Sequence, residues 1–240
     1  MRRTGIALLF VAALLAAGPA AARGTYRSAV VALALWSDPV FRSEATGAAK
    51  IVAARFGHGG PVVIRVNTPA RLAAGPEGIA SALAAGGRGL DPQRDVLFII
   101  LTSHGAPGGI AEKGGGRTGL LPPDDLSALL ARSPVRHKVL IVSACFAGTY
   151  TALASDDTLV ITAADATHTS FGCVPEARWT YFGDAFFNHA LRQDDSILKA
   201  FADARGIVAA RETSEGLTPS NPQIAGGNAV LAILNEGASR

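Results

Sequence analysis

The chain has 240 residues, of which 49% are hydrophobic and 17% are charged, and its formal net charge is +3. This length suffices for one α/β domain with a substantial core, and the composition excludes an intrinsically disordered protein. Lysine and arginine do not cluster beyond the N-terminus, so the sequence predicts no nucleic-acid-binding surface.

Residues 1–22 have the organisation of a secretory signal peptide. A pair of arginines precedes a short apolar run, which ends in small residues that suit a signal peptidase. The apolar run is too short for a comfortable membrane span. We therefore expect cleavage after Ala22, with Ala20 as the alternative. The product would be an exported, periplasmic protein without a stable membrane span, and its single domain would cover residues 23–240.

The rest of the chain alternates between apolar runs typical of buried strands and segments typical of helices. Strands are expected at residues 29–35, 61–66, 95–102, 138–143, 158–163 and 228–234. Helices are expected at residues 43–56, 77–85, 122–132, 180–191 and 196–211. Apolar runs without polar alternation indicate strands that are buried on both faces, as in parallel sheets. The sequence therefore predicts a single three-layer α/β/α domain with a mostly parallel sheet of about six strands.

Two of the predicted strands end in polar motifs. Ser103-His104-Gly105 follows the strand at 95–102, and Ser143-Ala144-Cys145 follows the strand at 138–143. Parallel strands bring their carboxyl ends to one edge of the sheet, where open α/β folds bind ligands, and neighbouring strands lie about 4.8 Å apart. We therefore expect His104 and Cys145 to reach one substrate. The glycine-rich segment 106–119 lacks phosphate-loop spacing and is interpreted as a mobile substrate-binding loop.

This pair of residues suits nucleophilic catalysis. An adjacent imidazole can convert a thiol into the reactive thiolate, so Cys145 is the candidate nucleophile and His104 the candidate proton carrier. Gly105 has no side chain and would let a substrate approach the backbone. The amides of Gly105 and Cys145 could then form an oxyanion hole.

Each of these residues also has an ordinary interpretation. An isolated cysteine is more often a small buried residue than a nucleophile. In an oxidising compartment Cys145 and Cys173 could instead form a disulfide, which would block the nucleophile. His168, in the loop at 167–178, is a second catalytic candidate. The remaining histidines are interpreted as loop or surface residues without a role: His58, His137 and His189.

The two polar motifs resemble those of the caspase–legumain group of cysteine peptidases. Two later segments, Thr169-Ser170-Phe171-Gly172-Cys173 and Thr180-Tyr181-Phe182-Gly183-Asp184, are similar to the legumain-like (C13) family, especially its exported bacterial branch. The resemblance covers nearly all of the mature chain. It implies a caspase-like fold, endopeptidase activity through His104 and Cys145, peptide or protein substrates, and no cofactor or metal.

The same resemblance implies a substrate pocket. Arg42 and Asp184 match a pocket arginine and a pocket aspartate, and Ser170 would line the wall. Such a pocket would suit asparagine at P1, since its carboxamide can both accept and donate hydrogen bonds. Ser143 replaces a glutamate of legumains and Val40 replaces an asparagine, which predicts looser selection of small polar P1 residues. The alternative for both pocket charges is a surface or salt-bridged role.

Two other classes of function are compatible with these residues. A transamidase or ligase would use the same thioester and pass the acyl group to an amine. A non-catalytic binding protein on this fold would contain an inert Cys145. The sequence predicts no oligomeric state.

Overall fold

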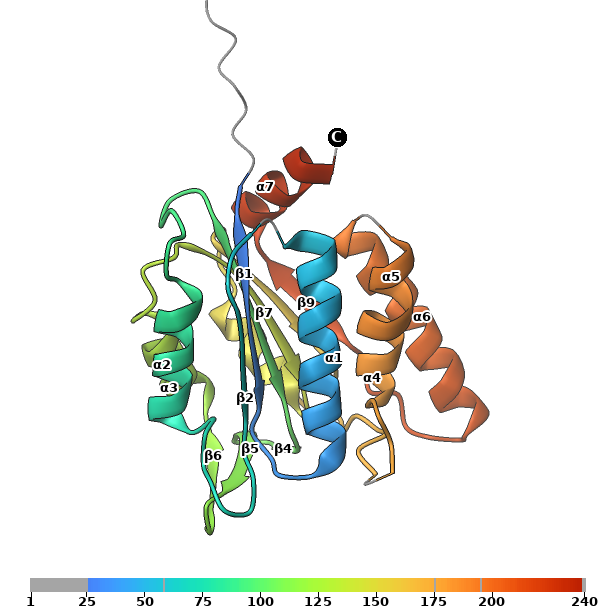
Figure 1. Cartoon of the computed structure of the whole chain (residues 1–240). Coiled ribbons are helices and arrows are strands. Elements are labelled where there is room, and N and C mark those ends of the chain that lie inside the picture. The colour runs from blue at the N-terminus through green and yellow to red at the C-terminus, as the bar shows by residue number, and fades with distance from the viewer. Residues whose placement is uncertain (1–25, 58, 175, 195, 239–240) are drawn as a thin grey trace, which may run out of the picture.

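The computed structural model describes residues 26–57, 59–174, 176–194 and 196–238. Its centre is a six-stranded sheet with the strand order β2-β1-β3-β7-β8-β9 (Figure 1). Neighbouring strands pair in parallel except for β8 and β9, which are antiparallel. This architecture confirms the predicted α/β/α domain with a mostly parallel sheet. The predicted signal peptide and His58 lie outside the described residues.

The elements have the following bounds. The strands are β1 (Ser28–Ala34), β2 (Val62–Val66), β3 (Val96–Thr102), β4 (Gly105–Ala106), β5 (Gly109–Gly114), β6 (Arg117–Leu121), β7 (His137–Ser143), β8 (Thr158–Thr162) and β9 (Gln223–Gly226). The helices are α1 (Pro39–Phe56), α2 (Pro76–Gly86), α3 (Pro123–Leu130), η1 (Ala147–Leu153), α4 (Tyr181–Gly183), η2 (Asp184–Ala190), α5 (Leu191–Gln193), α6 (Ile197–Ser214) and α7 (Asn228–Ala238). Among these described helices, none combines the length and the apolar character that a membrane span needs.

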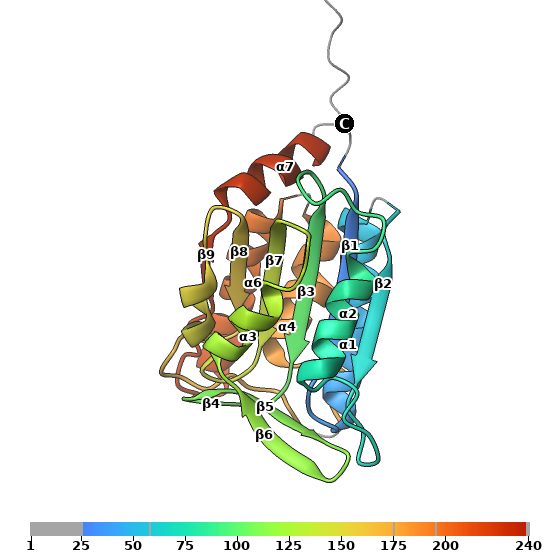
Figure 2. The ribbon, with the colours of Figure 1, turned by 90° about the vertical axis from the view of Figure 1, so that its left-hand side faces the viewer.

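Two helical layers cover the sheet. Helix α1, the continuous α4–η2–α5 helix and α6 cover one face, while α2 and α3 cover the other (Figures 1 and 2). Helix α7 contacts β7 and β8 at the end of the molecule opposite the β4–β6 hairpin. Each face has its own hydrophobic core. Strands β1 and β3 are buried at every position, because the sheet is covered on both sides.

The predicted last strand at residues 228–234 is wrong, since these residues form helix α7. The strand is instead β9, which ends at Gly226. Gly226 and Gly227 both have positive φ values, of 68° and 78°, and turn the chain out of the strand. In the helix that follows, the buried residues Val230 and Leu234 are four positions apart, which is the helical repeat.

The interpretation of residues 106–119 as a mobile loop is also wrong. These residues belong to the antiparallel β4–β6 sheet, which lies at the carboxyl end of β3 (Figure 2). Gly115 and Gly116, both with positive φ, form the tight turn between β5 and β6. Tyr150 anchors the hairpin from η1: its hydroxyl donates to the carbonyl of Leu121 and accepts from the amide of Ile110 at 2.8 Å.

Two local expectations are corrected as well. His137 is not a solvated histidine: it is 7% exposed at the start of β7, and its Nε2 lies 3.0 Å from the carbonyl oxygen of Gln93. Helix α1 begins at Pro39 rather than near Ser43. Proline is favoured at the first helical position, where its fixed φ suits the helix and no amide donor is needed.

Candidate functional site

The carboxyl ends of β3 and β7 bring the two polar motifs together. Thr102 pairs with Ser143 across the two strands, so His104 and Cys145 each lie two residues beyond this pair. A Cβ atom placed on Gly105 would lie 2.0 Å from the carbonyl oxygen of Cys145 and 3.1 Å from its nitrogen. The residue after His104 therefore packs directly on the backbone of Cys145. Residue 105 must therefore be glycine, because a side chain here would clash with the Cys145 backbone.

Cys145 is partly exposed, and its sulfur lies beside Ser170. The amide nitrogen of Ser170 is 3.3 Å from the sulfur, and the carbonyl and hydroxyl oxygens of Ser170 are 3.4 Å and 3.9 Å from it. These contacts hold the Cys145 side chain against the Ser170 segment. Within the described part of the chain, Cys145 forms no hydrogen bond with His104. Contacts between a nucleophile and its base are often long in a ligand-free site.

The two cysteines are both free, so the structure contains no disulfide between Cys145 and Cys173. Burial raises the pKa of the Cys173 thiol, and the nearby Cys145 acts in the same direction. A raised pKa keeps Cys173 in the unreactive thiol form at neutral pH. Of the two, Cys145 is therefore the candidate nucleophile.

The residue after Cys145 forms a sharp turn. Phe146 has a φ of 57° and a ψ of 17°, the left-handed conformation that residues with a side chain seldom adopt. Its amide donates to the carbonyl of His168 at 2.9 Å. The preceding amide, that of Cys145, donates to no other group in the residues that the structure describes. It is therefore available to a ligand oxygen, as an oxyanion hole requires.

His104 is held between aromatic rings and a carboxylate. The centroid of its ring lies 5.0 Å from that of Trp36 and 4.9 Å from that of Phe41, and both contacts are edge-to-face. Its Nε2 lies 3.6 Å from Oδ2 of Asp38, the residue that precedes α1. Both side chains are about one-third exposed, so this pair contributes little to stability. Asp38 can nevertheless orient the imidazole, as the third group of a nucleophile–base arrangement does.

A buried carboxyl group lies behind the two motifs. Glu44 on α1 is 0% exposed. Its Oε1 accepts a hydrogen bond from the Thr102 hydroxyl, and its Oε2 accepts one from the Thr180 amide, both at 2.8 Å. Ser143 also hydrogen-bonds to this carboxyl group, and its hydroxyl oxygen lies 3.2 Å from that of Thr180. Glu44 thus connects the strand ends that carry His104 and Cys145.

The position of Glu44 affects both its protonation and its neighbours. Burial raises the pKa of the Glu44 carboxyl, although its hydrogen bonds with Ser143, Thr180 and Thr102 oppose this shift. A Cβ atom on Gly183 would lie 2.0 Å from Oε2 of Glu44, so only glycine leaves room for the carboxyl group there. The role of Glu44 is therefore structural. Its hydrogen bonds hold the strand ends that carry the site, and its carboxyl group is closed to solvent.

The predicted pocket residues occupy three different environments. Arg42 is exposed on α1 and lines a groove that also contains Asn188. Asp184 begins η2, where its Oδ1 accepts from the side-chain amide of Asn188 at 2.8 Å. Asn188 thus shares a groove with Arg42 and a hydrogen bond with Asp184, whereas Asp184 is not part of the groove lining. Ser143 is 1% exposed, and its hydroxyl hydrogen-bonds to that of Thr180 inside the protein. It therefore supports the site from behind.

The segment that carries Ser170 is fixed by a second polar cluster. His168 places Nδ1 2.7 Å from Oδ2 of Asp165, and Asn221 donates to the same oxygen at 3.1 Å. Although desolvation opposes the shift, hydrogen bonds from Thr167, His168 and Asn221 hold the pKa of Asp165 below its usual range. His168 is thus engaged with Asp165 and shapes the loop beside Cys145.

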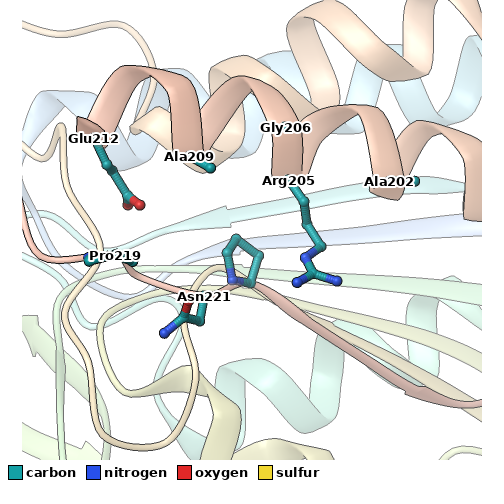
Figure 3. A pocket seen from close by; sticks show the side chains of 8 residues that line it. Ala202, Arg205, Gly206, Ala209, Glu212, Pro219 and Asn221 are labelled. Carbon is teal, nitrogen blue, oxygen red and sulfur yellow. The ribbon is translucent and has the colours of Figure 1, made fainter. Parts of the chain in front are cut away.

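A separate hollow of about 330 Å³ lies between α6 and residues 219–222 (Figure 3). Glu212 points into this region from α6, and its Oε2 accepts from the amide of Ser220 at 3.0 Å. Its Oε1 is buried without a hydrogen-bond partner among the described residues. The lining contains no thiol or hydroxyl group. We therefore assign no reaction to this hollow.

Sequence reasoning missed two residues of the site. Asp38 follows the carboxyl end of β1 and therefore lies at the same sheet edge as His104. Glu44 carried a clearer signal. It lies three and four positions from the apolar residues Phe41, Val40 and Ala48, on the stripe that α1 buries. A carboxylate on a buried stripe needs partners, and the strand ends provide them.

Comparison with known proteins assigns the chain to a family. The family model described as "Peptidase C13 family" matches residues 58–228. No curated protein matches the chain. Among solved structures, caspase-1 from Spodoptera frugiperda is similar, with a TM-score of 0.56 and 14% sequence identity over 84% of this chain and 87% of that chain. At this identity the likeness shows the fold, and it confirms the predicted caspase-like architecture. Because the family model spans more than half of the sequence, the chain belongs to the peptidase C13 family.

Proposed function

We propose that this protein is a cysteine endopeptidase that uses Cys145 as its nucleophile and His104 as its proton carrier. One observation carries the proposal. A free, partly exposed thiol lies at the carboxyl end of β7, and the backbone of its residue, Cys145, packs directly on Gly105, the residue that follows His104 at the end of β3. Membership of the peptidase C13 family supports a peptidase with peptide or protein substrates.

The proposed reaction passes through a thioester. The Cys145 thiolate attacks the scissile carbonyl carbon and forms a carbon–sulfur bond, while the amides of Gly105 and Cys145 donate to the oxyanion. His104 carries the thiol proton to the leaving amine as the carbon–nitrogen bond breaks. Water then attacks the thioester and gives a proton to His104, which returns it to the sulfur as the carboxylic product leaves.

The same proposal includes a preference for asparagine at P1. Arg42 and Asn188 line the same groove, Asp184 accepts a hydrogen bond from Asn188, and Ser170 contacts the Cys145 sulfur. An arginine and an aspartate together can donate to a carboxamide oxygen and accept from its nitrogen. A P1 aspartate would meet Asp184 as a like charge, which is costly in a desolvated pocket. Small polar residues, asparagine first, are therefore the expected P1 class.

A peptide library tests activity and specificity together. The wild-type protein and the Cys173→Ala variant should cleave the library, and Cys145→Ala should be inactive. A preference for P1 arginine or for large apolar residues would contradict the pocket assignment. Adding an amine such as hydroxylamine separates hydrolysis from acyl transfer, because a transamidase or ligase would give the amine adduct as its main product.

The rate of alkylation tests the nucleophile without any substrate. Iodoacetamide at neutral pH should modify Cys145 much faster than Cys173, whose pKa is raised by burial. Peptide mass mapping over time gives both rates in one sample. A slow Cys145, equal to Cys173, would favour a non-catalytic binding protein.

We also propose that the protein is exported to the periplasm, on the basis of its N-terminal sequence. Intact-mass measurement of secreted protein should show the loss of about 22 residues. A full-length N-terminus on periplasmic material would contradict this proposal.

A further inference from the structure

A groove of about 870 Å³ runs along the outer side of α1. Helix α1 forms one wall from Pro39 to Ala54, and Arg178, Trp179 and the α4–η2–α5 helix complete the lining. These limits lie 15 residues apart on the helix, which corresponds to about 22 Å. An extended peptide covers this distance with about seven residues. The groove therefore has the length of a bound polypeptide segment.

The charges of this groove have one sign. Arg42, Lys50, Arg178 and Arg192 line it, and its lining contains no aspartate or glutamate. All four side chains are exposed, and none forms an ion pair with another residue that the structure describes. Arg42 and Lys50 lie two helical turns apart, about 12 Å along the axis, so one small anion cannot bridge them. The arrangement suits an extended acidic segment.

The groove begins beside the proposed catalytic residues. Pro39 lines one end of the groove, and the preceding residue, Asp38, lies 3.6 Å from Nε2 of His104. Trp179 packs against α1 at Gly47, where an added Cβ would lie 2.5 Å from its ring. The next residue, Thr180, donates its amide to Glu44 behind the site. The end of the groove at Pro39 is therefore the end from which a polypeptide bound at His104 would enter it.

We infer that this groove binds an acidic stretch of the substrate polypeptide on one side of the scissile bond. The inference rests on the proposed endopeptidase function and adds a substrate class to it. The aromatic ring of Trp179 and the apolar side chains of Pro39 and Ile51 contact the backbone and stems of the segment. Lys50, Arg178 and Arg192, the cations that the proposed P1 pocket does not use, pair with its carboxylates. Electrostatic complementarity of this kind selects among substrates.

Binding to the Cys145→Ala protein tests the inference independently of turnover. Labelled peptides with asparagine at the central position would carry four glutamates, or four glutamines, on one side or the other. Fluorescence anisotropy should show about ten-fold tighter binding for one acidic peptide than for its neutral partner, since each exposed pair adds a few-fold. The difference should disappear near 0.5 M salt, where screening acts over a few ångströms.

Charge reversal identifies the surface. Lys50→Glu combined with Arg192→Glu should reduce the acidic-to-neutral ratio to about two or below. The matched double reversal Arg94→Glu with Arg205→Glu, at exposed positions outside the groove, should keep it near ten. Equal affinity for acidic and neutral peptides would overturn the inference, as would equal competition by a DNA duplex of the same charge. If no peptide is cleaved by the wild-type protein but the acidic preference persists, the endopeptidase proposal fails and the groove assignment stands.

Discussion

The buried carboxyl group of Glu44 gives the most informative substitution. Glu44→Ala removes the acceptor of the Thr102 hydroxyl and of the Thr180 amide, both of which are buried. Each unsatisfied buried group costs about 1–3 kcal/mol, and relief from burying the carboxyl group offsets part of this sum. We expect a loss of about 2–4 kcal/mol in the free energy of unfolding. Urea denaturation followed by circular dichroism measures it.

The same substitution should lower turnover in the protein that remains folded. Thr102 and Ser143 lie two residues before His104 and Cys145, so their displacement moves both proposed catalytic groups. A misplacement of about 1 Å can reduce the rate about a hundred-fold. Asp95→Ala is the matched control, because Asp95 is a buried carboxylate that accepts two amides at the opposite end of β3. It should lose stability while kcat stays unchanged.

The pH dependence of Glu44→Gln tests the protonation state. Because burial raises the pKa of Glu44 in the folded protein, its favourable contribution is present below pH 4.5 and is lost as the pH rises through the raised value. Glutamine cannot ionise, so the variant should gain stability relative to wild type between pH 5 and pH 8. If the variant instead loses relative stability over this range, Glu44 is stabilised as a carboxylate and the reasoning is refuted.

Three further predictions concern the surroundings of the site. Gly105→Ala should destabilise the protein by about 1–3 kcal/mol and abolish turnover, since the added Cβ would clash with the Cys145 carbonyl. Gly119→Ala is the control in melting and activity assays, because an added Cβ there has no atom within 4 Å. Asp38→Ala should lower kcat/KM about five-fold through loss of His104 orientation, and an unchanged value would remove Asp38 from the mechanism. Burial raises the pKa of Glu112 to about 7, so its contribution to stability is lost as the pH rises from 4.5 through 7. Glu112→Gln should therefore be more stable than wild type at pH 8, by about 3 kcal/mol at most, and equal melting temperatures there would contradict this.

The apolar runs of this sequence predicted five of the six strands of the central sheet. Continuous runs before Ser103 and Ser143 indicate strands covered on both faces, because no alternating polar face exists. The parallel order then places His104 and Cys145 at one edge. Strand polarity and the right-handed crossover determine this placement before any tertiary contact is known.

The predictions from sequence were wrong where the local residue pattern is compatible with two structures. Residues 228–234 are apolar enough for a strand or a buried helix, and the paired glycines at 226–227 decide in favour of a turn followed by α7. The glycine-rich hairpin looked like a mobile loop because its anchor, Tyr150, comes from η1, which is distant in sequence.

The sequence by itself identified the candidate thiol and imidazole, Cys145 and His104, and the sheet edge at which they lie. Only the tertiary structure decided how these groups are supported and what lies around them. Asp38 reaches His104, Glu44 connects two strand ends, and Ser170 contacts the Cys145 sulfur through segments far apart in the chain. Such contacts leave no periodic signal, because they depend on how α1 and the 165–180 segment pack on the sheet. The cationic groove along α1 has the same origin, since its charges meet only when α1 and α5 lie side by side.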